Sequence, residues 1–316
     1  MGTAGSSSTT ASGTNEWHSW ARSLLASHVA LVLFSTIALT TILNGPPSPL
    51  LLREPNATIM RLGWTLSGPT YVVLGALAAL AHATGAVGAR RAVALFSIAS
   101  GIALASELLG TSTGLPFGEY RYTPLLGYRI LGLVPFPIPV SWFYMLYSSL
   151  AIVSRLRPAR DDAATRWKWA ALAGLVLLAW DVSMDPAMVA TAHWVWGAGD
   201  AFHDAAIPVW LTAFFAHDVF YGMPLSNWFG WYVTGTLIAW LMLMITPPTC
   251  IAQRIAPSRL PLFLYLANGI MPVALCIRDD LRLAALLGGV AMLLPFVLAW
   301  RARVPAMPRA VTRGAA

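Results

Sequence analysis

The residues that could do chemistry gather in one stretch of the chain. Between Lys168 and Arg254, 85 consecutive residues contain no lysine or arginine. The same stretch contains three histidines and five aspartates: His193, His203, His217, Asp181, Asp185, Asp200, Asp204 and Asp218. A carboxyl group in apolar surroundings with no cation nearby favours its neutral, protonated form. Since a protonated carboxyl group can give its proton to a substrate, the stretch predicts acid catalysis.

Asp181 and Asp185 are the strongest candidates for catalytic acids. Residues four apart lie on one face of a helix, so the two carboxyl groups should be neighbours. We expect Pro186 to end that helix, because the residue before a proline avoids the helical conformation. Carboxylates favour the amino end of a helix, so their place at a carboxyl end indicates function. The alternative is a solvated helix end.

Glu107 is a second acid candidate. It lies in the otherwise apolar run from Ala92 to Leu109, and an acid inside a membrane span indicates a functional site by default. The predicted topology places it at the same end as Asp181 and Asp185. The alternative is a glutamate that reaches the interface or pairs with Arg121 or Arg129.

Aromatic residues follow each of these acids. Glycines and prolines fix turns, and aromatic side chains beside them would form a rigid apolar wall. The aromatic candidates for such a wall are Phe117, Tyr120, Tyr122, Trp142, Trp194, Trp196 and Trp231. The alternative is an ordinary interfacial aromatic belt. Asn227, in the turn before Trp231, could cap a helix or orient a water molecule.

Other site classes receive less support. The dipeptides His203–Asp204 and His217–Asp218 leave open an iron site with two histidines and one carboxylate, although the six histidines form no close pairs; His18, His28 and His82 read as bystanders. The sequence contains neither a Gly-rich phosphate loop nor a Gly-x-Ser-x-Gly turn. Its two cysteines exclude a disulfide scaffold.

Composition decides which elements must position these residues. Hydrophobic residues make up 57% of the 316 residues and charged residues only 10%, which excludes soluble, disordered and fibrous classes. The net charge is +7, but the arginines are spread over loops, so no nucleic-acid partner is expected. The sequence therefore predicts an all-α, polytopic transmembrane helix bundle.

Apolar runs long enough to span a bilayer predict eight helices. They lie at about 24–43, 62–83, 92–109, 138–156, 167–185, 228–246, 260–277 and 281–300. The stretch 205–216 is shorter and predicts a re-entrant segment; if it spans, the count is nine. We expect a disordered polar segment over 1–20, one membrane domain over 21–303 and a basic tail over 304–316. Without a signal-peptide pattern, the first span is expected to be an uncleaved anchor.

Charge bias predicts the orientation. With eight spans, 14 cations fall on the side of the two termini and 6 on the other. The positive-inside rule then places both termini in the cytoplasm, in what we expect to be a bacterial inner membrane.

An ordered set of these residues resembles a known family. The set is Glu107, Gly110, Thr113, Gly114, Pro116, Phe117, Gly118, Tyr120, Tyr122, Pro139, Trp142, Asp181, Asp185, Pro186, Trp194, Trp196, Gly222, Pro224, Asn227, Gly230 and Trp231. Over about residues 60–300 the chain resembles the carotenoid biosynthesis membrane-protein family, which includes gamma-carotene C-1′,2′ hydratases and bisanhydrobacterioruberin hydratases. The segment 197–221 is longer than the family pattern.

The resemblance implies a hydratase. It would add water across the terminal C-1′,2′ double bond of an acyclic carotenoid end group, with no cofactor and no metal. We expect Asp181 or Asp185 to be the acid, and the other carboxylate or Glu107 to position the water. The aromatic residues named above and Asn227 would line the substrate site. Expected partners are a carotenoid within the bilayer, membrane lipid and other carotenoid pathway enzymes. The alternatives are a metal-dependent carotenoid oxygenase and a non-catalytic transporter or assembly partner.

Overall fold

The computed structural model describes residues 7–46, 48–197, 214–215 and 219–303. Its longer helices are α1 (Ser7–Ile37), α2 (Asn56–Val87), α3 (Ala89–Thr113), α4 (Pro137–Leu156), α5 (Ala163–Ala190), α7 (Leu225–Ile245), α9 (Leu260–Arg278) and α10 (Arg282–Arg301). The short elements are the π-helical turn Ala38–Ile42, the 3-10 turn Pro124–Leu126, α8 (Pro248–Arg254), and the strands β1 (Tyr120–Tyr122), β2 (Arg129–Ile130), β3 (Val134–Pro135) and β4 (Trp194–Trp196).

Eight helices in this part of the chain are long and apolar enough to cross a membrane. They coincide with the eight predicted spans, so the expected all-α polytopic bundle is confirmed. Helices suit this environment because they satisfy every backbone hydrogen bond internally. The expected re-entrant segment 205–216 falls almost wholly outside the described residues.

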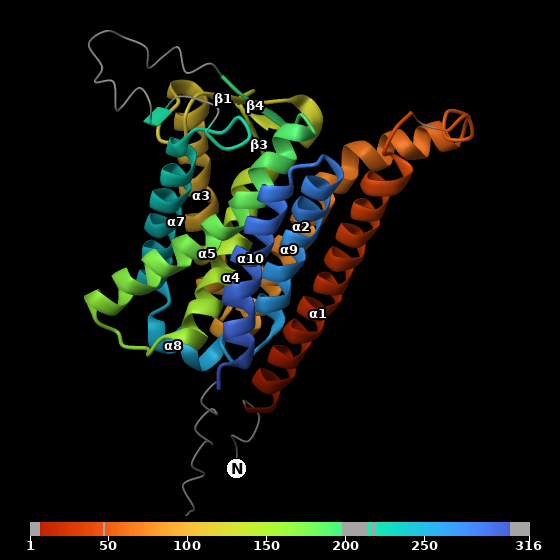
Figure 1. Cartoon of the computed structure of the whole chain (residues 1–316). Coiled ribbons are helices and arrows are strands. Elements are labelled where there is room, and N and C mark those ends of the chain that lie inside the picture. Colours follow the sequence, from red (N-terminus) through yellow and green to blue (C-terminus); the bar gives the residue numbers. More distant parts are fainter. Residues whose placement is uncertain (1–6, 47, 198–213, 216–218, 304–316) are drawn as a thin grey trace, which may run out of the picture.

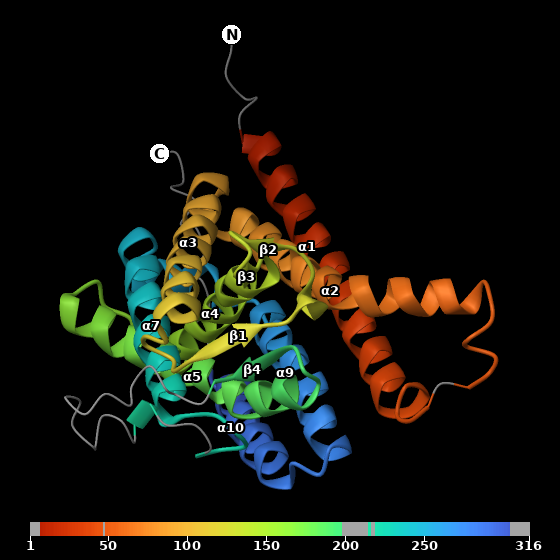
Figure 2. The same ribbon diagram turned by 90° about the horizontal axis from the view of Figure 1, so that it is seen from above.

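One helix, α4, lies at the centre of the bundle (Figures 1 and 2). Sixteen of its 20 residues are buried, and it packs against α2, α3, α5 and α9. The peripheral helix α10 instead exposes a row of aliphatic side chains: Leu283, Leu286, Leu287, Val290, Leu293, Leu294 and Leu298. Such a face suits hydrocarbon rather than water. The cavity described below is built around α4.

The helix that carries the two aspartates runs further than expected. We predicted that Pro186 would end it, but α5 continues to Ala190 with Pro186 inside it. Proline removes a single N–H donor, and packed neighbours in a membrane bundle tolerate that loss. Close packing is visible on the other side of α5, where a Cβ at Gly174 would lie 3.1 Å from the backbone oxygen of Tyr232 in α7. Asp181 and Asp185 therefore lie inside the bundle and not at a helix end.

Two short antiparallel strand pairs cover one end of the bundle (Figure 1). β1 pairs with β4 and β2 pairs with β3. At this same end the α1–α2 hairpin extends away from the other helices (Figure 1). The opposite end carries the start of α1, the end of α10 and α8 (Figure 1). Because α1 begins at Ser7, residues 7–20 are helical where we expected a disordered segment.

Candidate functional site

A cavity of about 70 Å³ lies inside the bundle, next to the β1–β4 pair. Its walls are mostly apolar and aromatic, and among the described residues no lysine or arginine lines it. The predicted site residues that line it are Glu107, Phe117, Tyr120, Tyr122, Trp142, Asp185, Trp194, Trp196, Asn227 and Trp231. Residues from distant parts of the sequence thus line one cavity.

The Asp181–Asp185 pair is buried beside this cavity. Asp181 is 0% exposed and Asp185 is 2% exposed. The Asn227 amide bridges the two carboxyl groups, donating from Nδ2 to Oδ2 of Asp181 at 3.0 Å and to Oδ2 of Asp185 at 2.7 Å. Asn227 is therefore no helix cap, since its side chain is committed to the aspartates. Only Asp185 of the pair lines the cavity, and Asp181 stands behind it.

The second oxygen of Asp185 is held by β4. Trp194 and Trp196 both donate their indole N–H to Oδ1, at 2.8 and 3.3 Å. Side chains two apart on a strand point to the same face, which lets both indoles reach one carboxyl group. With Asn227, this carboxyl group accepts three N–H donors. By contrast, Oδ1 of Asp181 has no hydrogen-bond partner within the described residues.

Glu107 is held in the same way by β1. The hydroxyls of Tyr120 and Tyr122 donate to Glu107 Oε2, at 2.5 and 2.8 Å. Glu107 is only 3% exposed, so it does not reach the interface. Neither does it pair with Arg121 or Arg129 in the described structure. Burial raises the pKa of both tyrosine hydroxyls well above its usual value, so they stay protonated and donate.

The register of the strand pair links the two acids. Tyr120 faces Trp196 across the sheet, and Tyr122 faces Trp194. The same face of this small sheet therefore presents two phenols to Glu107 and two indoles to Asp185. The side chain of the intervening Arg121 points to the other face, as the alternation of a strand requires. The strand pair fixes both carboxyl groups against one cavity.

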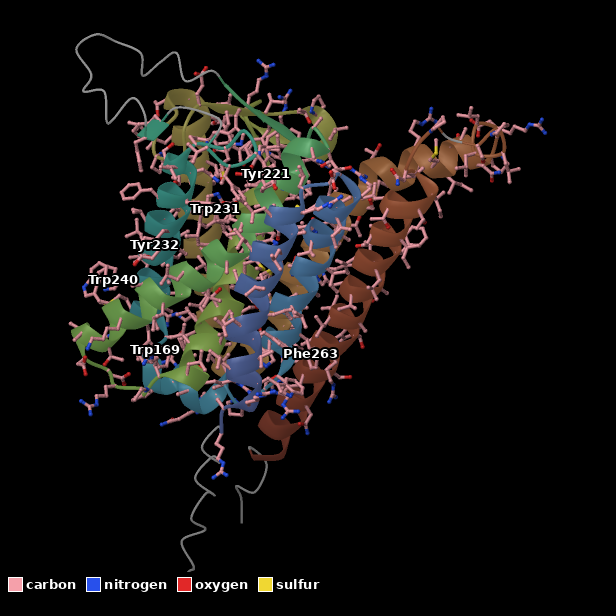
Figure 3. The ribbon with its side chains drawn as sticks, viewed as in Figure 1. Trp169, Tyr221, Trp231, Tyr232, Trp240 and Phe263 are labelled. Atoms are coloured by element: carbon pink, nitrogen blue, oxygen red, sulfur yellow. The ribbon has the colours of Figure 1, made fainter. Side chains whose placement is uncertain are left out.

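Indole rings form a further wall of the cavity. Trp142 of α4 and Trp231 of α7 are stacked, with ring centroids 4.4 Å apart, and Trp180 meets Trp231 edge to face. Trp231 lies in the half of the bundle that carries β1 and β4 (Figure 3). The ring faces of such indoles attract cations. The wall can therefore stabilise positive charge that develops in the cavity.

Phe117 is wedged between α3 and α7. A Cβ at Gly230 would lie 2.5 Å from Phe117 Cδ1, and one at Gly110 would lie 2.7 Å from Cδ2. The backbone oxygen of Phe117 accepts a hydrogen bond from Ser226 Oγ at 2.9 Å. The two glycines make room for the ring, and the ring in turn holds the segment that leads into β1.

A polar cluster at the far side of the cavity was missed by the sequence reasoning. Asn268 accepts from the Tyr144 hydroxyl at 3.1 Å, and its amide contacts His28 Nε2 at 3.3 Å. The other ring nitrogen of His28, Nδ1, donates to the backbone carbonyl oxygen of Tyr71 at 2.7 Å. His28 is thus a partner in this cluster and not the bystander we expected. Polar residues in the middle of apolar runs, at positions 28 and 268, were the available signal.

The remaining histidine candidates are largely untested. His203, Asp204, His217 and Asp218 lie outside the described residues. Among the residues that are described, no group of three or more histidine, cysteine or acidic side chains is arranged to hold a metal. His193 bonds to Thr191 Oγ1 at 2.8 Å, and burial lowers its pKa to about 4. It is a satisfied polar group at the foot of β4.

Residues 67–295 match the carotenoid biosynthesis protein family. The chain belongs to that family. Bisanhydrobacterioruberin hydratase from Haloarcula japonica is 30% identical to this carotenoid biosynthesis family member over 131 residues. The aligned part covers 42% of this chain and 38% of that protein, so it spans well under half of each. No solved structure matches the chain.

Proposed function

We propose that this protein is a membrane-embedded carotenoid hydratase. It would add water across the terminal C-1′,2′ double bond of an acyclic carotenoid end group and leave a tertiary alcohol. Family membership and the hydratase relative support a carotenoid-modifying enzyme. The observation that carries the finer assignment is the pair of buried acids, Glu107 and Asp185, on one cation-free aromatic cavity.

Asp185 is the proton donor in this proposal. It lines the cavity, whereas Asp181 does not. The two carboxyl groups are bridged by one amide, and two like charges at such separation cannot both ionise without a nearby cation. They therefore hold one proton between them. The three N–H donors on Asp185 favour its ionised form, so the shared proton rests on Asp181. It passes to Asp185 and from there to the alkene carbon that bears hydrogen, and the neighbouring carbon becomes a tertiary cation.

The indole wall stabilises that cation. Trp142 and Trp231 line the cavity with their rings stacked, and each aromatic face is worth roughly 0.5–2 kcal/mol to a nearby cation. Exclusion of bulk water from the site strengthens this attraction. The cavity walls also keep other water molecules from reaching the cation before the water held by Glu107 does.

Glu107 positions the water that captures the cation. A carboxylate that accepts two phenol O–H bonds on Oε2 retains lone pairs on Oε1 for a water molecule. Water attacks the tertiary carbon, a C–O bond forms, and its surplus proton passes to Glu107. Return of this proton from Glu107 to the aspartate pair through water in the cavity restores both acids, so each turnover adds one water and changes no oxidation state.

We also propose the orientation, the membrane and the partners. The start of α1 and the end of α10 lie at the same end of the bundle (Figure 1). The arginine bias favours a cytoplasmic location for this end, and the membrane proposed is a bacterial inner membrane. The acids then lie toward the opposite face. The substrate enters from the bilayer, and other carotenoid pathway enzymes are the expected partners. The chain would form one membrane domain over 21–303 with a basic tail over 304–316.

Co-expression with a lycopene- or gamma-carotene-producing pathway tests the proposal. We expect a pigment heavier by one water, with heavy oxygen incorporated from labelled water. Label from dioxygen would instead establish an oxygenase. Unchanged pigments, with the protein verified in the membrane and several acyclic carotenoids offered, would contradict the hydratase assignment.

A further inference from the structure

A second hollow lies at the end of the bundle that is remote from the acids. It is a groove of about 1240 Å³ between α1, α2 and the connection from α8 to α9. Phe263, which lines it, lies in the opposite half of the molecule from Trp231 (Figure 3). The proposed hydration reaction makes no use of this groove.

One part of the groove is cationic. Arg22, Arg254 and Arg259 line it, and no aspartate or glutamate of the described part of the chain does. In the described structure none of the three arginines forms an ion pair. Arg259 stacks on the Trp300 ring at 3.8 Å, which orders its guanidinium without neutralising it. The groove therefore offers uncompensated positive charge to an anion.

A buried histidine with a free nitrogen lies at the floor of the same groove. His82 lines the groove and is 1% exposed. Its Nδ1 lies 2.7 Å from the Tyr147 hydroxyl, while Nε2 has no partner among the described residues. When the tyrosine donates to Nδ1, the imidazole carries its hydrogen on Nε2. This nitrogen is itself covered, and the His18 ring lies 5.5 Å from the His82 ring between centroids, so the histidines make the floor of the groove polar.

The rest of the groove is an apolar track along α1. It is lined by Leu25, Ala26, Val29, Ala30, Leu33 and Phe263. From Arg22 to Leu33 the helix rises about 16 Å at 1.5 Å per residue. One leaflet of hydrocarbon is roughly 15 Å thick, half of the ~30 Å bilayer core. The track is therefore as long as an acyl chain that runs parallel to the helix.

We propose that this groove binds an anionic phospholipid of the surrounding bilayer. The phosphate-bearing headgroup lies among the three arginines, and one acyl chain follows α1 toward Leu33. Positive charge at one end and an apolar track at the other match an amphiphile better than free phosphate. The proposal stands apart from the hydratase assignment, since it concerns the opposite end of the bundle.

Lipid retention by the purified full chain tests the site. The protein is reconstituted in discs with equal parts of phosphatidylcholine and phosphatidylglycerol, released, and weighed by native mass spectrometry. Wild type should retain phosphatidylglycerol selectively. The double variant Arg22→Gln/Arg254→Gln should retain it roughly tenfold less, because each arginine near the headgroup contributes to anionic lipid binding. Equal retention of phosphatidylcholine by wild type would overturn the proposal.

A matched control removes the same charge from the same end. Arg90→Gln/Arg91→Gln takes two exposed arginines from the start of α3, outside the groove. This control should retain phosphatidylglycerol like wild type. If it loses the lipid as fully as the groove variant, the binding reflects general surface charge and the site is wrong.

A third variant separates the lipid from a free anion. Ala26→Trp fills the apolar track and leaves every arginine in place, and Ala26 is exposed, so folding should survive. We expect loss of phosphatidylglycerol with this variant and no displacement by inorganic phosphate. If phosphate displaces the lipid and Ala26→Trp retains it, the groove is an anion site without an acyl-chain track.

Discussion

The two sides of the cavity hold their acids with different donors. On the α3–β1 side, Glu107 accepts the O–H groups of Tyr120 and Tyr122. On the α5–β4 side, Asp185 accepts only N–H groups, from two indoles and an amide. Both acids are buried, and both are held by the same pair of strands. The sides differ in the chemistry of the donor and in the second carboxyl group behind Asp185.

In the proposed hydration reaction, this difference in donors suggests the direction of proton transfer. A hydroxyl both donates and accepts, so the tyrosine side can relay a proton. Indole and amide N–H groups donate only, so the aspartate side can keep a proton but cannot pass it through its donors. We infer that the aspartate pair stores the proton for the alkene and that the glutamate side receives the proton of the attacking water.

We expect the largest loss of conversion when the aspartates that hold the proton are replaced. Asp185→Asn keeps the size of the side chain but removes the acid, so conversion should fall on the order of 10³-fold. Asp181→Asn should cost less, roughly 10- to 100-fold, because it disturbs the partner of the acid and not the acid itself. Pigment mass spectrometry at matched protein levels measures both. A greater loss with Asp181→Asn would reverse the two roles.

On the opposite side we expect a smaller loss. Glu107→Gln should reduce conversion about 100-fold, since a base contributes roughly 10²–10⁴-fold to such steps. Tyr122→Phe should reduce conversion about tenfold, because the hydroxyl of Tyr120 still donates to the Glu107 carboxylate. Incorporation of heavy oxygen from labelled water reports this step directly. If Glu107→Gln converts substrate as well as wild type, Glu107 does not receive the proton of the attacking water.

Packing between the sides is tested at Gly230. In Gly230→Ala the new methyl group would lie 2.5 Å from the Phe117 ring, and overpacking of this kind costs about 1–3 kcal/mol of stability. The melting temperature in detergent should fall. Gly101→Ala in α3 is the control, because a Cβ there meets no atom within 4 Å. Similar melting temperatures for the two variants would show that Phe117 is not wedged.

The smallest expected effect is a change of folding stability with pH, and it arises at His193 on the aspartate side. The pKa of His193 is lowered to about 4 by burial in the fold, against about 6.5 for a free histidine. Between pH 6.5 and 4 the unfolded chain binds this proton and the folded chain does not, so stability falls as the pH falls. We expect a loss of about 1 kcal/mol, since the ring is only partly covered.

His193→Gln should flatten this part of the stability profile, as measured by thermal unfolding at pH 7 and pH 5. His193 directly precedes Trp194, so the strand that holds Asp185 should loosen first in acid. The tyrosine strand has no such group, because burial raises the pKa of Tyr120 and Tyr122. An equal acid sensitivity in His193→Gln would place the titrating group elsewhere.

Local pattern explains most of what could be predicted. Long apolar runs identify the eight helices because nothing else satisfies the backbone in hydrocarbon. An acid in such a run is costly, which is why Glu107, Asp181 and Asp185 stand out. The same logic applied to His28 and Asn268 would have found the second polar cluster. The helix end at Pro186 was wrong because packing of neighbouring helices outweighs a local preference.

Composition and spacing alone thus determined a helical membrane bundle, the acids within it and the aromatic residues around them. Only the tertiary structure decided how the acids are paired with donors. Tyr122 and Trp194 are neighbours across β1 and β4, although α4 and α5 separate them in the chain. No local signal encodes that register, because it is set by how the helices pack and where their ends meet. The burial of Asp181 behind Asp185 and the groove at the far end have the same origin.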